Sequence, residues 1–206
     1  GRETEMLVAE LAELDKKRIR VILEGGEDFV LYRGEVKRYS IQEGEELPQG
    51  QYEEIRTEVL AKRAKKRAMH LLENMDRTEA QLREKLKQGF YPEDIVEEAI
   101  AYVKSFRYLD DARYAENYVR GQKGKKSQRR IQMDLMGKGI KRELAAQALE
   151  EGYQQGQEQE LILKWVQKKN YSSSQGDLKA KQKMYQFLLR KGFQPDDILH
   201  VLDYLT

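Results

Sequence analysis

A short segment that joins two helices occurs three times in this chain, and it constrains the fold more than any other feature. GFYPEDI at residues 89–95 recurs as GFQPDDI at 192–198, and KGIKREL at 138–144 is a weaker copy between them. The glycines of the copies lie 50 and 53 residues apart, a period that suits about three helices per repeat. These glycines are Gly89, Gly139 and Gly192. We expect each to end a helix, and Gly89 to do so in the left-handed conformation that glycine adopts readily.

The helical period continues through most of the chain. From residue 51 onward, apolar residues recur at three- and four-residue spacings. Thr78 and Gln81 have the spacing of a capping box, which satisfies free N–H groups at the start of a helix. The sequence therefore predicts a mainly α protein with three tandem three-helix repeats in an elongated stack. We place the repeats at residues 51–108, 109–153 and 154–206.

Residues 1–50 differ from the repeats and are predicted to form a small N-terminal unit with a β-hairpin. In KRIRVILEGGEDFVLYR, two β-prone runs flank Gly25 and Gly26, a pair that suits a tight hairpin turn. We expect a charged helix at about residues 3–16 before the hairpin. GEVKRYSI at 34–41 fits either a third short strand or one helical turn, and GEELPQGQ is typical of a linker.

Charge is distributed unevenly along the chain. Charged residues make up 36% of the sequence, yet the formal net charge is only +2. Residues 120–142 hold nine Lys and Arg against one acid, Asp134, which gives this segment a local charge of +8. Such a concentration indicates a polyanionic or acidic partner at one place on the surface.

Cysteine content and hydropathy predict a cytoplasmic protein. The chain contains no cysteine, so disulfide and thiolate chemistry are excluded. It also has no apolar run near the ~20 residues that span a bilayer. The first residues, GRETEMLVAEL, have no apolar core of the kind found in signal peptides.

Asp110 and Asp111 are adjacent carboxylates, a pattern that could bind a cation or share a proton. Both uses require further ligands that converge on the pair, and no His or carboxylate lies at a telling spacing. Ala112 and Ala115, with either Tyr118 or Val119, follow as the apolar face of a helix. The aspartates are therefore interpreted as a helix start, where an acid caps free N–H groups and favours the helix dipole.

Other catalytic patterns are absent or incomplete, so the sequence does not predict an enzyme. GQKGKKS has only two residues between Gly121 and Gly124, whereas a phosphate-binding loop needs four. His70 and His200 are the two histidines and fall in different repeats, which does not favour a zinc or catalytic site. Trp165, Tyr185 and Phe187 have helical spacing and are predicted to pack in a core. We expect no catalytic residue, no metal and no cofactor.

The basic run is the best candidate for a binding surface. One acid interrupts it, and it spans a glycine-containing loop and a helix start, from which long cations could reach an extended anion. The candidate residues are Arg120, Lys123, Lys125, Lys126, Arg129, Arg130, Lys138, Lys141 and Arg142. A second basic group receives less weight because it covers most of a helix circumference; it comprises Lys62, Arg63, Lys65, Lys66 and Arg67.

Three motifs in order resemble the RecX family of recombination regulators. YLDDARYAENYVR carries a Leu-Asp-Asp-x-Arg-aromatic-Ala pattern. The second motif, RRIQMDLMGKGI, contains Lys-Gly-Ile, and the third, FLLRKGFQPDDI, contains the corresponding Lys-Gly-Phe. The positions to which the family pattern and the repeat pattern give a structural role are Leu109, Asp110, Asp111, Arg113, Tyr114, Gly89, Gly139 and Gly192. Two departures are present: one residue fewer than expected separates Leu86 from Gly89, and residues 1–50 have no counterpart in shorter members.

The resemblance implies a non-catalytic protein that binds the RecA–single-stranded DNA filament along its groove. It implies modulation of recombinase and ATPase activity, usually inhibition, and a role in recombination regulation, DNA repair and the SOS response. Single-stranded DNA would be contacted directly or through RecA, and we expect a monomer with no membrane partner. A stand-alone helical module that binds DNA non-specifically is the alternative, and it would bind bare DNA as well as it binds a filament.

Overall fold

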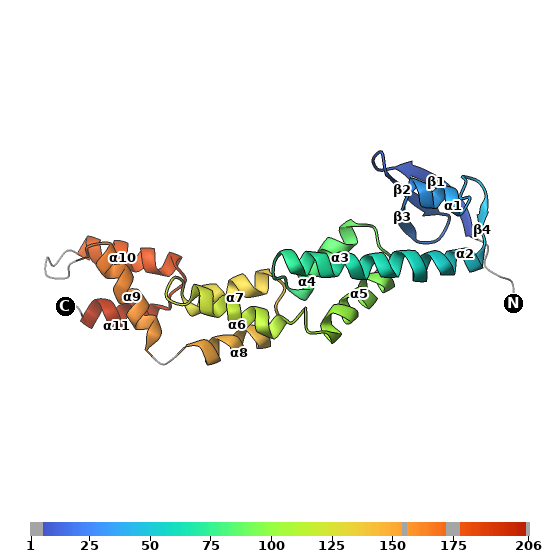
Figure 1. The fold of residues 1–206 in the computed structure, drawn as a ribbon. Coiled ribbons are helices and arrows are strands. Elements are labelled where there is room, and N and C mark those ends of the chain that lie inside the picture. Colours follow the sequence, from blue (N-terminus) through green and yellow to red (C-terminus); the bar gives the residue numbers. More distant parts are fainter. Residues whose placement is uncertain (1–5, 154–155, 172–177, 205–206) are drawn as a thin grey trace. The chain divides into compact units, whose positions relative to one another are not determined.

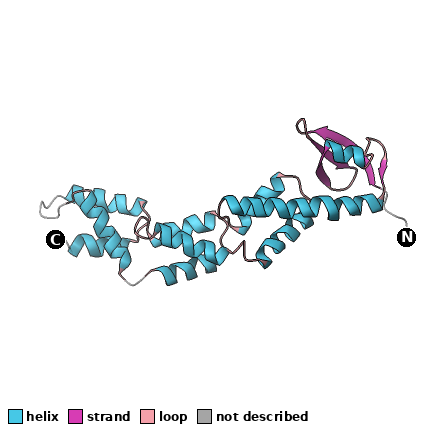
Figure 2. Ribbon diagram, viewed as in Figure 1, coloured by secondary structure: helices cyan, strands magenta, loops and turns pink. Residues whose placement is uncertain are grey.

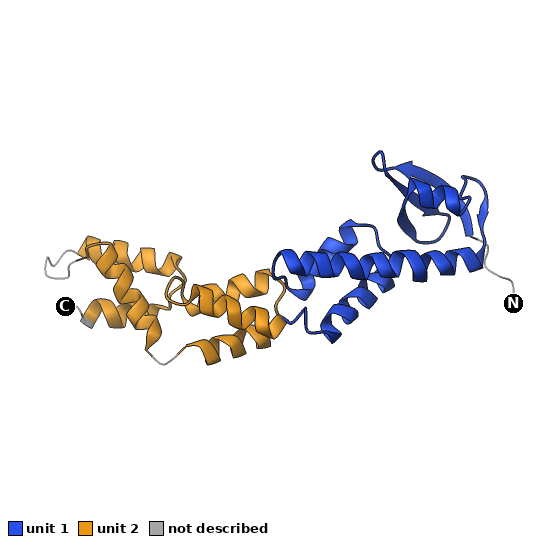
Figure 3. Cartoon of the chain, viewed as in Figure 1, with its two compact units in different colours: residues 1–110 blue, residues 111–206 orange. Residues whose placement is uncertain are grey.

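The computed structural model describes residues 6–153, 156–171 and 178–204, which form two compact units. Unit 1 comprises residues 1–110 and unit 2 comprises residues 111–206 (Figure 3). Each unit has its own apolar core. The chain is mainly helical, with strands at its N-terminal end (Figure 2).

An antiparallel sheet of four strands begins unit 1, and its order is β3-β2-β1-β4. The strands are β1 (Met6–Glu13), β2 (Arg18–Leu23), β3 (Asp28–Tyr32) and β4 (Glu46–Leu47). Val21 on β2 pairs with Phe29 on β3, and both side chains are completely buried. Gly25 turns the chain between these two strands with a φ of +66°, so the predicted hairpin is confirmed.

The helix expected at about residues 3–16 is wrong over the described residues, because Met6–Glu13 forms β1. Residues 3–5 lie outside the described residues. β1 pairs with β2 on one side and with β4 on the other. Pairing on both edges gives its N–H and C=O groups partners, and this tertiary context overrides the helix preference of a Glu-, Ala- and Leu-rich segment.

The two short segments that follow the hairpin are more ordered than a linker. Of the alternatives for residues 34–41, a short helix is the one found, α1 (Arg33–Arg38). GEELPQGQ, predicted to be a linker, contains β4 and the first residues of α2 (Gln49–Glu54). Strand β4 exists because β1 offers it an edge, which no local pattern of two residues could indicate.

A long helical segment joins the sheet to the first repeat (Figure 1). It consists of α2, a π-helical segment (Ile55–Leu60) and α3 (Ala61–Asn74), and the repeat is completed by α4 (Glu79–Gln88) and α5 (Glu93–Ser105). Sheet and helices share one core, which includes Phe29, Ile55 and Val96. The Arg56 guanidinium forms ion pairs with Glu27, in the hairpin turn, and with Asp94, in the first turn of α5. These contacts fix the sheet to the helices.

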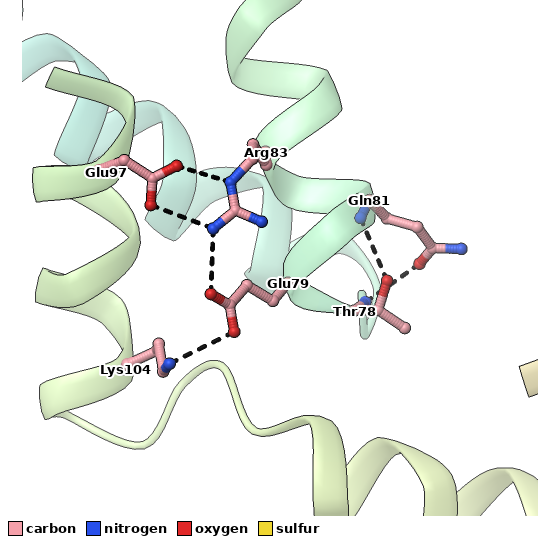
Figure 4. A network of polar contacts seen from close by, with 6 residues as sticks. All are labelled: Thr78, Glu79, Gln81, Arg83, Glu97 and Lys104. Carbon is pink, nitrogen blue, oxygen red and sulfur yellow. Dashed lines mark hydrogen bonds and ion pairs between the residues drawn. The ribbon is translucent and has the colours of Figure 1, made fainter. Parts of the chain in front are cut away.

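The predicted capping box at the start of α4 is confirmed (Figure 4). The Thr78 hydroxyl accepts a hydrogen bond from the Gln81 N–H at 3.1 Å, and the Gln81 side chain accepts one from the Thr78 N–H at 3.1 Å. One turn further, Arg83 donates two hydrogen bonds to Glu97 on α5, at 2.6 and 3.1 Å. These bonds hold the pKa of Glu97 below its ordinary value.

Unit 2 contains six helices within its described residues, in two groups of three. The first group is α6 (Asp111–Gln122), α7 (Gln128–Gly137) and α8 (Arg142–Gly152), and the second is α9 (Gln157–Lys168), α10 (Leu178–Arg190) and α11 (Pro195–Tyr204). Ile131 and Leu135 are buried in the first core, and Ile162 and Leu188 in the second. Trp165, Tyr185 and Phe187 are partly buried against the second core, as their spacing predicted.

The glycines of the repeated segment do not all have the same backbone conformation. Gly139 and Gly192 have φ values of +89° and +95°, which is the left-handed conformation. Gly89 has a φ of −83°, so the expectation for this residue is wrong, and Phe90 takes the left-handed position with a φ of +60°. The cause is the missing residue after Leu86: in the other repeats the left-handed glycine is the fourth residue after a buried leucine, and here that position is occupied by phenylalanine.

The two groups of helices in unit 2 meet at the start of α7. Ser127 caps this helix by accepting a hydrogen bond from the Arg130 N–H at 3.2 Å. Its hydroxyl also donates a hydrogen bond to the carbonyl of Lys191 at 3.3 Å, in the turn before α11. The Gln128 N–H donates to a carboxylate oxygen of Glu158, on α9, at 2.5 Å. The N–H groups at the start of α7 are therefore bonded partly by its own cap, Ser127, and partly by the third repeat.

Gly192 lies directly against this junction. A Cβ atom at this position would come within 2.8 Å of the Ser127 hydroxyl oxygen and within 3.4 Å of the Arg130 Cβ. Gly124 also has a left-handed backbone, with a φ of +88°, but a Cβ there would meet nothing within 4 Å. The two glycines thus separate the cost of backbone strain from the cost of crowding.

We predict that Gly192→Ala lowers the free energy of unfolding of unit 2 by about 2–4 kcal/mol, because left-handed strain and crowding both apply. The control Gly124→Ala should cost only about 1–2 kcal/mol from strain alone. The fluorescence of Trp165, the single tryptophan, followed through urea unfolding measures both variants. Equal losses would contradict the packing role of Gly192.

Candidate polyanion-binding surface of the middle repeat

The nine basic candidate residues lie within one segment of the middle repeat, residues 120–142. Arg120 is in the last turn of α6, and Arg129 and Arg130 are in the first turn of α7. Lys123, Lys125 and Lys126 occupy the loop between these helices, Lys138 and Lys141 lie in the turn after α7, and Arg142 begins α8. The two connections of the repeat therefore carry most of the charge.

Asp134 neutralises part of this charge from within the repeat. One of its carboxylate oxygens accepts hydrogen bonds from the Lys126 ammonium at 2.7 Å and from the Tyr118 hydroxyl at 2.9 Å. The other oxygen lies 3.5 Å from the Nε atom of Arg130. Partial burial acts to raise the pKa of Asp134, but the bonds from Lys126 and Tyr118 outweigh burial and hold that pKa below its ordinary value. Lys126 and Arg130 therefore belong to an internal network.

Two further lysines of the candidate set lie over aromatic rings. The Lys123 ammonium is 5.8 Å from the ring centre of Tyr153, and the Lys138 ammonium is 5.5 Å from that of Tyr118. Attraction between a cation and a ring face at these distances is weak but leaves the charge in place. These lysines can still contribute to the electrostatic potential of the surface.

Six of the candidate residues, Lys123 beside the Tyr153 ring among them, are exposed and form no ion pair with an acid within the described residues. Lys125, Arg129, Lys141 and Arg142 form no ion pair within the described part of the chain, and the same holds for Arg120, which donates a hydrogen bond to the Asn117 side chain at 3.3 Å. Arg120, Lys125 and Arg129 lie near the start of α7, and Lys141 and Arg142 lie beyond its end. Because α7 has 10 residues, these two groups are about 15 Å apart. This spacing suits an extended anion better than a single phosphate group.

The residues of the Leu-Asp-Asp motif lie at the junction of the two units in the sequence. Leu109 is buried in the core of unit 1. Helix α6 begins at Asp111, directly after Asp110, which is the position predicted for a helix start. Arg113 and Tyr114 are half-buried on α6. Over the described ranges, no group of three or more His, Asp or Glu side chains is arranged to hold a metal ion.

The second basic group divides into two sets. Lys62 and Lys65 form ion pairs with Glu58 at 2.5 Å and Glu98 at 3.1 Å. The other three members, Arg63, Lys66 and Arg67, line a cavity in unit 1. The sequence pattern alone does not separate these two sets, but Arg63 lies three and four residues before Lys66 and Arg67, a spacing that indicates a common face.

Comparisons with known proteins agree with this architecture. Family models described as the first, second and third three-helix domains of RecX match residues 64–102, 110–149 and 157–202. "Regulatory protein RecX" of Caldanaerobacter subterraneus subsp. tengcongensis is 30% identical over 200 residues, which cover 96% of this chain and 99% of that protein. A protein of the same name from Clostridium botulinum (strain Alaska E43 / Type E3) is 26% identical over 196 residues, 94% of this chain and 92% of that protein.

Solved structures show the same fold. A crystal structure of regulatory protein RecX aligns with a TM-score of 0.62 at 25% identity and covers 96% of this chain and 99% of that chain. The crystal structure of RecX from Lactobacillus salivarius aligns with a TM-score of 0.60 at 27% identity, over 70% of this chain and 96% of that one. The three helical repeats with their N-terminal strands give this chain the architecture of the RecX structures. This chain belongs to the RecX family.

The described helices also bear on membrane association. Within the part of the chain that the structure describes, none of them is long and apolar enough to cross a bilayer.

We predict that Asp134→Asn lowers the free energy of unfolding by about 1–2 kcal/mol at neutral pH, because Lys126 and Tyr118 lose a charged acceptor. Since the pKa of Asp134 is lowered in the folded state, its contribution is present above the ordinary value of about 3.9 and is lost as the pH falls through the folded pKa. The difference between variant and parent should therefore shrink in acid.

Urea unfolding followed by far-ultraviolet circular dichroism at neutral and acidic pH measures this difference. Glu150→Gln, a change of an exposed acid on α8, is the matched control and should leave stability nearly unchanged. A loss of stability in Asp134→Asn that stays the same at every pH would contradict the assigned role of its charge.

Proposed function

We propose that this protein binds the RecA–single-stranded DNA filament along its groove and modulates recombinase and ATPase activity, in the direction of inhibition and without catalysis of its own. The partner and the direction follow from the family resemblance, and the relatives named as regulatory proteins support a regulatory role. The observation that carries the binding surface is the set of exposed cations of the middle repeat that no acid neutralises. These are Arg120, Lys123, Lys125, Arg129, Lys141 and Arg142.

Physical reasoning links this surface to inhibition. A filament of recombinase on DNA is an extended polyanion, and clustered Lys and Arg attract such a partner from a distance and retain it through ion pairs. Two groups of cations about 15 Å apart, one at each end of α7, can engage more than one point along the partner. A protein held in the groove would occupy the path of the incoming strand. Inhibition then needs occupancy only, and the protein acts as a cytoplasmic monomer.

The proposal is tested by reversing the exposed charge. We predict that a variant with Lys125→Glu, Arg129→Glu, Lys141→Glu and Arg142→Glu needs at least about tenfold more protein to inhibit RecA-driven strand exchange, a loss of about 1.4 kcal/mol or more in binding. The matched control reverses four exposed lysines elsewhere: Lys16→Glu, Lys37→Glu, Lys87→Glu and Lys183→Glu. Both variants have the same net charge, so a difference reports on position.

Inhibition that survives in the first variant at the parent concentration would show that this surface is wrong, provided its helical circular dichroism is unchanged. The alternative of a stand-alone DNA-binding module is separated by titrating the parent protein against bare single-stranded DNA and against filaments at two salt concentrations. The proposal requires tighter binding to the filament. Equal affinity for both, with a steep fall in salt, would favour the alternative.

A further inference from the structure

A basic cavity in unit 1 lies between the N-terminal sheet and the first helical repeat. Its volume is about 750 Å³. The walls come from β2 and β3, from α3, and from the end of α4 with the turn that follows it. Sheet and helices share one core and are tied together by the ion pairs of Arg56, so these walls are held in place by the fold of the unit.

Four basic residues of α3 line this cavity. Arg63 lies three and four residues before Lys66 and Arg67, and His70 lies four and three residues after them, which places all four on one face of a helix. Arg18 from β2 and Lys85 from α4 add two cations from the other walls. The cavity therefore gathers basic side chains from three separate elements.

The charge of the cavity is largely uncompensated. No Asp or Glu is among the residues that line it. Arg18 pairs with Asp15 at 2.8 Å, and Arg63 pairs with Glu35 at 2.7 Å. Lys66, Arg67 and Lys85 are exposed and form no ion pair within the described residues. These three cations are available to an anionic ligand.

Two tyrosines lie among the cations. The guanidinium of Arg63 is 4.5 Å from the ring centre of Tyr32, which is 46% exposed. Tyr91 is half-buried in the cavity wall. Burial raises the pKa of the Tyr91 hydroxyl, whereas Arg63, Arg67 and Arg18, which line the same cavity, act to lower it. Aromatic faces beside Arg and Lys are the combination on which single-stranded nucleic acids stack and pair their phosphates.

We propose that this cavity binds a short segment of single-stranded nucleic acid, with phosphates at Lys66, Arg67 and Lys85 and a base against Tyr32 or Tyr91. The volume falls in the range of about 300–1,000 Å³ that holds one small organic ligand, which suits a nucleotide or two. An acidic peptide would satisfy the cations but would leave the aromatic faces without a matching partner. The inference goes beyond the proposed function, because the site lies in unit 1 and requires no recombinase.

The test measures binding of a fluorescently labelled oligothymidylate of about ten nucleotides to the full chain by anisotropy. The cavity variant carries Lys66→Gln, Arg67→Gln and Lys85→Gln. The control carries Lys16→Gln, Lys37→Gln and Lys87→Gln, which are exposed, lie outside the cavity and change the net charge equally. We expect the dissociation constant of the cavity variant to rise at least about tenfold, and its salt slope to fall by about 2, since each single-strand phosphate contributes about 0.7. The control should stay within about twofold of the parent.

Equal losses in the two variants would overturn the inference, because general charge would then explain binding. It would also be overturned if a polyglutamate peptide of the same charge displaced the oligonucleotide from the parent protein more effectively than unlabelled oligothymidylate does. Tyr32→Ala gives a second measurement and should weaken binding several-fold, as expected when one base loses its stacking partner. Unchanged affinity in both Tyr32→Ala and the cavity variant would place any oligonucleotide binding elsewhere.

The middle-repeat reversal variant separates this inference from the proposed function. On bare oligothymidylate with no recombinase, loss in the cavity variant supports the site in unit 1 whatever happens with filaments. Loss of oligonucleotide binding in the middle-repeat variant alone would overturn the cavity site and leave the proposed function standing. Failure of the middle-repeat variant to relieve inhibition would count against the proposed function only.

Discussion

A left-handed residue four positions after a buried leucine ends the second helix of each repeat, and the packing of the third helix depends on it. The pairs are Leu86 with Phe90, Leu135 with Gly139, and Leu188 with Gly192. The reversed backbone turns the chain so that the next helix returns against the same core. The same turn has a second use in two repeats: Gly192 lets the third repeat approach Ser127, and the turn at Phe90 is followed by Tyr91, which enters the basic cavity.

Sequence was a good guide wherever a local rule determined the structure. The hairpin at Gly25, the capping box at Thr78 and the fold of helical repeats were predicted and found. Prediction failed where residues distant in the sequence determined the local structure. Met6–Glu13 is a strand because β2 and β4 pair with its two edges. Phe90 rather than Gly89 has the left-handed conformation, because that conformation falls on the fourth residue after the core leucine, whichever residue is there.

The candidate site shows the same division between local and tertiary information. The sequence located the basic run, yet all nine cations look equivalent along the chain. Folding separates them, because Asp134 lies on α7 where it meets Lys126, Arg130 and the Tyr118 hydroxyl. Only a three-dimensional arrangement identifies which cations remain without an acid. The basic face of α3 could not be recognised as a site from the sequence either. It lines a cavity only because the sheet forms the opposite wall.

The central claim is that the middle repeat contacts the recombinase filament through the loop and helix starts that carry its free cations. Hydrogen–deuterium exchange of the full chain, with and without RecA–single-stranded DNA filaments, tests this claim without any substitution. The account predicts slower exchange in residues 120–142 when filaments are present, with the largest change in the loop before α7. Protection confined to other parts of the chain, with residues 120–142 exchanging at the same rate in both samples, would contradict it.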